Sequence, residues 1–584
     1  MKKLFVLYFF VCASIAFSQQ SDNNWTTYFE QSGFKGTPDY NQTMQYFQRL
    51  ADNSEYAELK TFGMSPQGRE LKFLVVNSKK NFDLDKIKKS GEPVVLIICG
   101  IHSGEIEGKD ASMILLREIL ITKEKKTLVD SLTLLVVPIF SVDAHERRSK
   151  YNRINQNGPE EMGWRTTSQN LNLNRDWMKA DAPEMQAMLQ LVSKWNPDFV
   201  IDSHTTDGAD YQYTLTYSVE KYRNIFSKSA EWIKNKFIPD FETGVEEAGF
   251  LVYPYIYLKN WRGGLDDGLI DWASTPRFST GYFALRNRPC LLIETHMLKP
   301  YKDRVYSTKA AFETVLNFVN ENAEELVNLN EEADKESINE FCKKKNFLPI
   351  SFNISDKYSE VDFKGYEFYW ENSDISGGKK LVYTHKPADF KVIFYNDVIA
   401  ADSVKLPAAY IIPQEWKEIV ERIHLHGIDF STIKKDTMLN VTVYKFKNVK
   451  LDSNSYEGRQ RASFDYDEEK KVIKISEGDI FIPTAQSNIR IIAGLLEPRS
   501  GDSFVQWGFF NSIFEQKEYF ESYVMENLAE EMLKEDPQLK NEFEQKLKEN
   551  ESFRNDPNAR LNFFYKRSPY WDNKLNVYPV LRVE

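Results

Sequence analysis

The chain has 584 residues and a formal net charge of −11 at pH 7, with 42% hydrophobic and 14% aromatic residues. This composition is sufficient for extensive cores and excludes a disordered chain. The negative charge disfavours nucleic acid and anionic lipid as partners, because both carry negative phosphates. At this length we expect two or three domains.

The first twenty residues, MKKLFVLYFFVCASIAFSQQ, are typical of an export signal. Two lysines precede an apolar stretch, and small residues stand one and three positions before a cleavage point after Ser18. The stretch is short for a membrane span. We therefore predict a signal peptide over residues 1–18 and an exported protein, periplasmic or secreted if the source is bacterial, with no membrane span.

Residues 19–335 alternate between short apolar runs and helix-like segments. The runs are rich in Val, Ile and Leu, as strands covered on both faces are: PVVLIICG (93–100), LTLLVVPIF (132–140), DFVIDSHT (198–205) and PCLLIETH (289–296). Helix-like segments such as APEMQAMLQLVSKW (182–195) lie between them. This alternation predicts an α/β domain with a mixed, largely parallel sheet flanked by helices.

The pattern changes near residue 336. Stretches such as VDFKGYEFYW (361–370) and LNVTVYKFKNVKL (439–451) alternate polar and apolar residues, which favours antiparallel strands with one wet face. A helical segment follows them. We therefore expect a β-rich accessory domain over 336–505 and a helical C-terminal region over 506–584.

Three of the seven histidines are followed three positions later by an acidic residue: His102/Glu105, His204/Asp207 and His426/Asp429. This spacing alone does not identify a metal site, so the surrounding sequence must discriminate. His426 lies in IHLHGID with His424, and we expect these two on one face of a strand, as a surface pair without a third ligand nearby.

His102, His204 and Glu294 each follow or end a different apolar run. Ligand sites of open α/β sheets form at the carboxyl ends of strands, so these side chains are expected to converge with Glu105. Gly100 and Gly104 allow a tight turn around His102. Two His and one Glu, with a fourth position left open, form the ligand set of a catalytic zinc. We therefore predict one Zn²⁺ per chain.

Asn174 and Arg175 lie in a polar loop before the helix that Pro183 helps to begin. An Arg beside an amide is suited to holding a planar carboxylate. Upstream, Arg165 follows Trp164 and could face a developing oxyanion.

Several of these motifs occur in the order found in one family. GIHSGE (100–105), NLNRDW (172–177) followed by APE, IDSHT (201–205) and LLIET (291–295) resemble the zinc carboxypeptidases of peptidase family M14, the funnelins, across roughly residues 40–325. The resemblance implies that zinc is bound by His102, Glu105 and His204.

The same resemblance implies roles for the other residues. Asn174 and Arg175 would hold the terminal carboxylate of the substrate, and Glu294 would be the general base and acid. Arg165 resembles the carbonyl-polarising arginine of the family, with Arg153 in YNRINQNG as the alternative. For the active-site tyrosine, Tyr282 in STGYFALRNRP is the best candidate, although a core or rim position suits it equally.

The sequence thus predicts an exported zinc metallocarboxypeptidase that hydrolyses the last peptide bond of a peptide or protein with a free C-terminus. Two alternatives stay open. One is a hydrolase of the same fold, such as a murein-peptide amidase or an N-acyl amino-acid deacylase. The other is a zinc-free surface protein that binds peptide or glycan. The sequence gives no indication of the oligomeric state.

Overall fold

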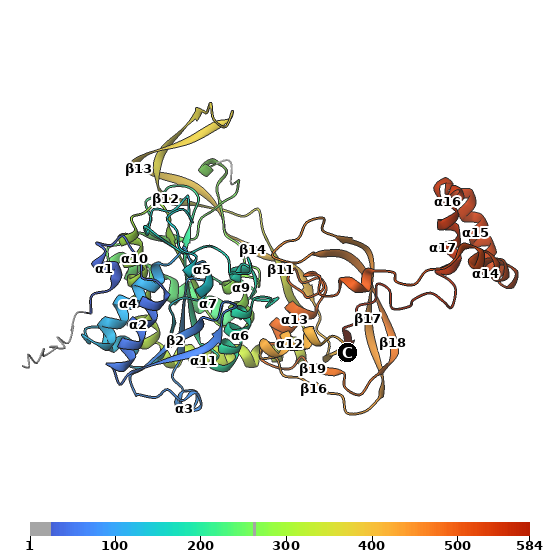
Figure 1. The fold of residues 1–584 in the computed structure, drawn as a ribbon, viewed down its shortest axis with the longest axis horizontal. Helices are drawn as coiled ribbons and strands as arrows, with labels where there is room; N and C mark the ends of the chain where they lie inside the picture. The colour runs from blue at the N-terminus through green and yellow to red at the C-terminus, as the bar shows by residue number, and fades with distance from the viewer. Residues whose placement is uncertain (1–24, 261–263) are drawn as a thin grey trace, which may run out of the picture.

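A computed structural model describes residues 25–260 and 264–584, so the predicted signal peptide over 1–18 lies outside the described residues. Figure 1 shows an N-terminal body, a second body beside it and a small group of helices at the far end of the molecule. No helix in the described ranges combines the length and the apolar character that crossing a membrane requires.

The N-terminal body is built on an eight-stranded sheet with the order β1-β2-β4-β3-β5-β10-β6-β7. Its four central strands are neighbours in parallel and correspond to the four apolar runs: β3 (Val94–Cys99), β4 (Thr133–Val137), β5 (Phe199–Thr206) and β10 (Cys290–His296). Their residues are buried almost throughout, which explains their continuous apolar character.

Both edges of this sheet contain antiparallel pairs, in which β2 joins β4 and β6 joins β10. The edge strands are β1 (Ala57–Met64), β2 (Glu70–Asn77), β6 (Leu215–Val219) and β7 (Val252–Pro254). The predicted fold class, a mixed and largely parallel α/β sheet flanked by helices, is confirmed.

Helices cover the two faces of the sheet differently. One face packs against α2 (Tyr40–Asp52), α4 (Glu107–Leu120), α8 (Ile238–Glu247) and α10 (Tyr301–Glu321). The other face packs against α6 (Pro183–Trp195) and α9 (Ser279–Leu285), which share one hydrophobic core with α12 (Lys417–Leu425) and α13 (Ile489–Leu496) of the second body. The remaining helices of the first body are α1 (Tyr28–Gln31), α3 (Leu84–Ser90), α5 (Val142–Glu146), α7 (Ser227–Trp232) and α11 (Ala323–Ile338).

The second body contains a six-stranded antiparallel sheet with the order β16-β19-β15-β20-β17-β18. Its strands are β15 (Ala409–Ile412), β16 (Ser431–Thr432), β17 (Thr437–Leu451), β18 (Ala462–Ile475), β19 (Ile480–Pro483) and β20 (Leu581–Val583). The antiparallel β-rich region expected after residue 336 is confirmed.

A long hairpin packs on the first body and projects from it (Figure 1). Its strands β12 (Ser359–Asn372) and β13 (Lys379–Tyr395) form a sheet with β8 (Tyr257–Leu258) and β9 (Leu269–Ile270) of the first body. A separate pair joins β11 (Leu348–Ile354) to β14 (Val398–Val404). The expected boundary at residue 335 falls inside α11, and the division into domains stays a prediction.

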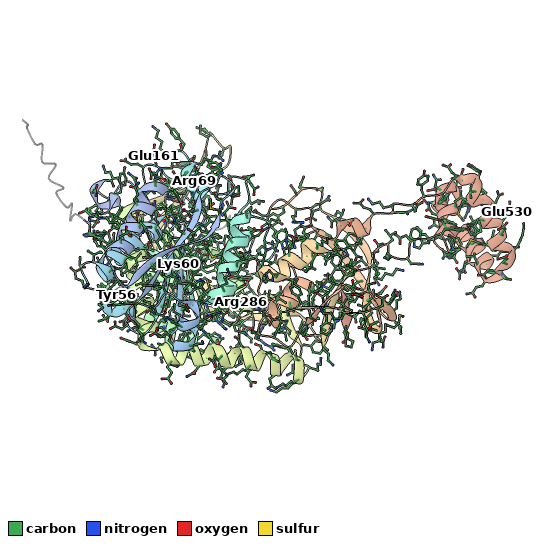
Figure 2. All side chains as sticks on the ribbon, turned by 60° about the horizontal axis from the view of Figure 1, so that its bottom comes forward. Tyr56, Lys60, Arg69, Glu161, Arg286 and Glu530 are labelled. Atoms are coloured by element: carbon green, nitrogen blue, oxygen red, sulfur yellow. The ribbon has the colours of Figure 1, made fainter. Side chains whose placement is uncertain are left out.

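The helical tail forms its own small core and stands apart from the two bodies, as the position of Glu530 in Figure 2 shows. Its helices are α14 (Ser522–Glu535), α15 (Pro537–Glu549), α16 (Glu551–Asn555) and α17 (Pro557–Tyr565). After this excursion the chain returns, and β20 pairs between β15 and β17.

Candidate metal centre and active site

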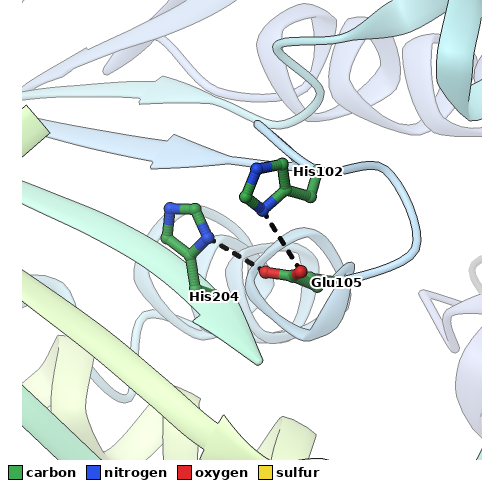
Figure 3. A group of neighbouring side chains, drawn as sticks. All are labelled: His102, Glu105 and His204. Carbon is green, nitrogen blue, oxygen red and sulfur yellow. Dashed lines mark hydrogen bonds and ion pairs between the residues drawn. The ribbon is translucent and has the colours of Figure 1, made fainter. Parts of the chain in front are cut away.

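His102, Glu105 and His204 meet at the carboxyl ends of β3 and β5 (Figure 3). One ligand atom from each lies within 4.8 Å of the other two, and all three side chains are buried. Glu105 lies between the imidazoles, with Oε1 at 3.2 Å from His102 Nδ1 and Oε2 at 2.9 Å from His204 Nδ1. The structure therefore brings together the three side chains that the sequence singles out as metal ligands.

Two glycines shape the turn that carries the first two of these residues. Gly100 has a φ of +68°, in the left-handed region that favours glycine, directly after β3. At Gly104, a Cβ atom would lie 2.8 Å from Arg153 Cγ. The absence of a side chain there lets Arg153 cross the turn and place Nη2 at 2.8 Å from Glu105 Oε1.

Each imidazole is oriented by a second polar group. His102 Nε2 lies 3.0 Å from Asn172 Oδ1, and His204 Nε2 lies 3.0 Å from Asp202 Oδ2. Ser279 Oγ donates to the same Asp202 oxygen at 2.6 Å. With both Nε2 atoms directed to these partners, the two Nδ1 atoms face Glu105. Such outer partners fix the ring orientation of metal-binding histidines, so the group fits a His₂Glu zinc site with an open fourth position.

The charges of this group are strongly coupled. Burial lowers the pKa of His102 to about 4. For His204, burial acts downward, but the neighbouring Asp202 and Glu105 raise its pKa above the ordinary value. Burial opposes ionisation of Glu105, yet His102 and Arg153 hold its pKa well below the ordinary range. Because a metal replaces protons on such ligands, binding a divalent ion would release a proton here.

Glu294 lies beside the metal group because β10 runs parallel to β5, with Glu294 in register with His204. Its side chain is 9% exposed, and Oε2 has no hydrogen-bond partner in the part of the chain that the structure describes. Burial raises the pKa of Glu294 to about 8, against the effect of His204 and with further contributions from Glu105 and Asp202. A carboxylate with a raised pKa is suited to proton transfer near neutral pH.

These residues open onto a cleft of about 470 Å³. Asn174, Arg175, Arg153 and Arg165 all line it. Arg165 Nη1 lies 3.4 Å from Glu105 Oε1, so both candidate arginines reach the same carboxylate. The Arg175 guanidinium stacks over Phe278 at 4.2 Å, which leaves its edge available for an anion in the cleft.

Tyr282 does not line this cleft. It is fully buried in α9, and its hydroxyl lies 3.1 Å from His426 Nδ1. The strand expected for His424 and His426 is wrong, because His424 lies in α12 and His426 caps that helix. His426 is also fully buried, so the expected surface pair is wrong as well.

Two tyrosines that the sequence reasoning missed line the cleft instead. Tyr255 and Tyr257 come from YPYIYL (253–258), and the Tyr255 hydroxyl lies 2.9 Å from Thr206 Oγ1. The signal was the density of aromatic residues in this short stretch. No motif placed it near the metal group.

Comparison with known proteins agrees with this geometry. Residues 43–277 match the zinc carboxypeptidase family. The chain is 22% identical over 492 residues to carboxypeptidase 2 of Trichophyton rubrum, covering 81% of this chain and 84% of that protein. Probable carboxypeptidase 2 of Arthroderma benhamiae is also 22% identical, with 80% and 85% covered.

Solved structures give weaker likenesses. A metallo-carboxypeptidase from Pseudomonas aeruginosa, in complex with (2-guanidinoethylmercapto)succinic acid, has a TM-score of 0.37 at 16% identity, covering 49% of this chain and 69% of that one. A putative carboxypeptidase A from Shewanella denitrificans has a TM-score of 0.37 at 18% identity, with 48% and 70% covered.

The resemblance drawn from the sequence motifs is confirmed, since the zinc carboxypeptidase match over residues 43–277 contains most of those motifs. The predicted class, a metallopeptidase enzyme, is confirmed with it. The matched range contains the three metal-capable residues together with Asn174 and Arg175, and Glu294 lies beyond it.

Proposed function

We propose that the protein is an exported zinc-dependent metallocarboxypeptidase that removes the C-terminal residue of peptides or proteins. The observation that carries this proposal is the convergence of His102, Glu105 and His204 with Glu294 in one cleft that also contains Arg175. Export rests on the sequence of residues 1–18, with cleavage after Ser18. The catalytic domain would span 19–335, followed by an accessory domain over 336–505 and a helical region over 506–584.

The metal would be one Zn²⁺ held by His102 Nδ1, His204 Nδ1 and a Glu105 oxygen. When bound, zinc polarises the scissile carbonyl and lowers the pKa of a bound water. Asn172 and Asp202 keep the imidazoles oriented for this task.

Glu294 would take a proton from the attacking water and deliver it to the leaving amine. Its buried oxygen without a partner and its raised pKa support this assignment. Arg165 or Arg153 would stabilise the negative oxygen that develops on the carbonyl. Both lie against Glu105, at the edge of the metal group.

Asn174 and Arg175 would hold the free carboxylate, so that only the last peptide bond reaches the metal group. Fixing the substrate in this way supplies much of the rate enhancement in such reactions. Tyr282 is not included among the substrate-binding residues, because it is buried away from the cleft.

A peptide-library digest tests this proposal. The zinc-loaded protein is incubated with peptides that carry either a free or an amidated C-terminus, and the products are read by mass spectrometry. Loss of single C-terminal residues from the free peptides only, abolished by a chelator and restored by zinc, is the expected result. Cleavage of amidated peptides at equal rates would point to an amidase, and a protein without bound zinc or turnover would contradict the proposal.

A further inference from the structure

Arg490 is a buried arginine without a counterion. It lies in the first turn of α13 and is 5% exposed. Among the described residues, Nε has no hydrogen-bond partner, and Nη1 donates to the backbone oxygen of Arg223 at 3.5 Å. The guanidinium also lies over the Phe341 ring, 5.0 Å from its centroid. Within residues 25–260 and 264–584, no carboxylate oxygen lies within 4.0 Å of its guanidinium.

Other buried arginines in the structure do have such partners. Arg304 lies 2.9 Å from Glu107, Arg288 lies 2.9 Å from Asp334, and Arg582 lies 3.2 Å from Glu497. Arg286 has no carboxylate, but it donates to the His426 backbone oxygen and to Asn196 Oδ1, at the junction of the two bodies (Figure 2). Burying a charge without a partner is costly. The described residues around Arg490 do not provide the negative group that would offset this cost.

Two cavities meet at Arg490. The larger has a volume of about 710 Å³ and lies between residues 221–234 of the first body and the segments around residues 336–349 and 396–398. The smaller, of about 130 Å³, contains Asn224 Oδ1 and Thr275 Oγ1, neither of which has a hydrogen-bond partner. The Arg490 side chain therefore borders two cavities rather than a fully packed core.

Charged side chains of both signs line the larger cavity. The acidic residues there are Glu231, Glu336, Glu340 and Asp397. Glu340 already accepts from Lys344 and Asn346, and Asp397 accepts from Ser355. Lys221 is paired with Asp271. Arg490 and Arg223 have no ion pair within the described part of the chain, and burial together with Arg223 lowers the pKa of Arg490 to about 10.

We propose that Arg490 and Arg223 form a binding site for a small anion that carries a carboxylate or phosphate group. A guanidinium pairs with either group through two parallel hydrogen bonds, which would supply the missing partner of Arg490. The larger cavity has room for an organic anion as well as for an inorganic ion. None of the residues that line the catalytic cleft borders this cavity, so the site is independent of the proposed peptidase reaction.

Calorimetric titration of the full-length protein with inorganic phosphate and, separately, with succinate tests the proposal. We expect saturable binding of at least one anion at a stoichiometry of one, and the comparison of the two distinguishes the phosphate from the carboxylate source. Arg490→Met should weaken binding at least tenfold. Arg499→Met is the matched control, because it removes the same charge from a side chain that is 45% exposed and borders neither cavity.

Thermal unfolding gives a second, independent readout. In chloride buffer Arg490→Met should unfold at the same temperature as wild type or higher, since the variant removes an unpaired buried charge. With the anion at saturation, wild type should unfold at a higher temperature than Arg490→Met, because the anion stabilises only the protein that has the binding site. If Arg490→Met fails to fold, Arg223→Gln on the exposed rim should still weaken binding threefold or more. Absence of saturable binding, or equal binding by wild type and Arg490→Met, would overturn the proposal.

Discussion

The two bodies of the molecule use their strands in opposite ways. In the first body, the central parallel strands are buried on both faces, and β3, β5 and β10 lead at their carboxyl ends to His102, His204 and Glu294. In the second body, β17 is buried mainly over residues 441–446, and β18 is buried only at its two ends. The described residues that line the proposed catalytic cleft all lie between positions 102 and 297.

This difference indicates that the two bodies have different roles. Chemistry gathers where parallel strands end together, because the sheet brings their terminal side chains to one edge. The second body instead extends the hydrophobic core beneath that sheet, while β13 of the hairpin pairs with β9 near the cleft tyrosines. We therefore expect substitutions in the cleft to alter turnover and substitutions at the junction to alter stability.

The largest effect is expected at Glu294. Glu294→Gln keeps the shape of the side chain but cannot accept a proton, so turnover should fall by about 10²- to 10⁴-fold. Bound zinc, measured by elemental analysis, should stay at one equivalent, because Glu294 is not among the three proposed ligands. A variant with full activity and full zinc content would assign the base to another residue.

Glu184 is fully buried at the start of α6 and is not among the residues that line the cleft, so it tests stability rather than turnover. Burial raises its pKa from 4.5 to about 7, with contributions from Asp143 and Asp176. Because the folded state holds this proton more tightly than the unfolded state, the free energy of unfolding decreases as pH rises from about 4.5 to about 7. Glu184→Gln avoids this loss and should be more stable than wild type by about 3 kcal/mol at pH 8.

Urea unfolding at pH 4 and pH 8 checks this expectation, since the two proteins should be nearly equal at pH 4. Glu530→Gln is the control, because Glu530 is 70% exposed on the separate helical tail. An advantage of Glu184→Gln that is the same at both pH values would show that the ionisation of Glu184 is not its cause.

Much of the first body was predictable from its sequence, because short stretches of neighbouring residues determine its strands. A continuously apolar run such as 94–99 identifies a buried strand by itself, and parallel strands that end together bring His102 and His204 into proximity. Tyr282 was not predictable in the same way. It lies in a short helix, where one residue more or less turns a side chain by about 100°, and here the packing against His426 directs it into the core.

The cleft tyrosines illustrate the same limit. Tyr257 lies in β8, which pairs with β9, and β9 itself pairs with β13 from more than a hundred residues further along the chain. Tyr255 follows β7, and its backbone N–H donates to the Tyr217 oxygen in β6. No pattern within 253–258 contains this information. Arg165 and Arg153 also could not be separated by spacing, and in the structure both contact Glu105.

Arg175 tests the substrate side of the cleft. Arg175→Gln removes the proposed charge-assisted hydrogen bonds to the terminal carboxylate, so kcat/KM for peptides with a free C-terminus should fall about 10- to 100-fold. Arg147→Gln is a matched control, because Arg147 also stacks on an aromatic ring at 4.2 Å but does not line the cleft. Equal losses in the two variants would argue against a specific role for Arg175.

The smallest effect is expected at Tyr282, where the two bodies meet. Tyr282→Phe removes the hydroxyl that lies 3.1 Å from His426 Nδ1 and leaves a buried nitrogen without that partner. The free energy of unfolding should fall by about 1 kcal/mol, while kcat/KM stays at the wild-type value. Tyr257→Phe should lower kcat/KM and leave the free energy of unfolding unchanged, because Tyr257 lines the cleft and not the junction. If Tyr282→Phe lowered turnover without loss of stability, the junction would be part of the catalytic machinery, and the separation between the two bodies would not hold.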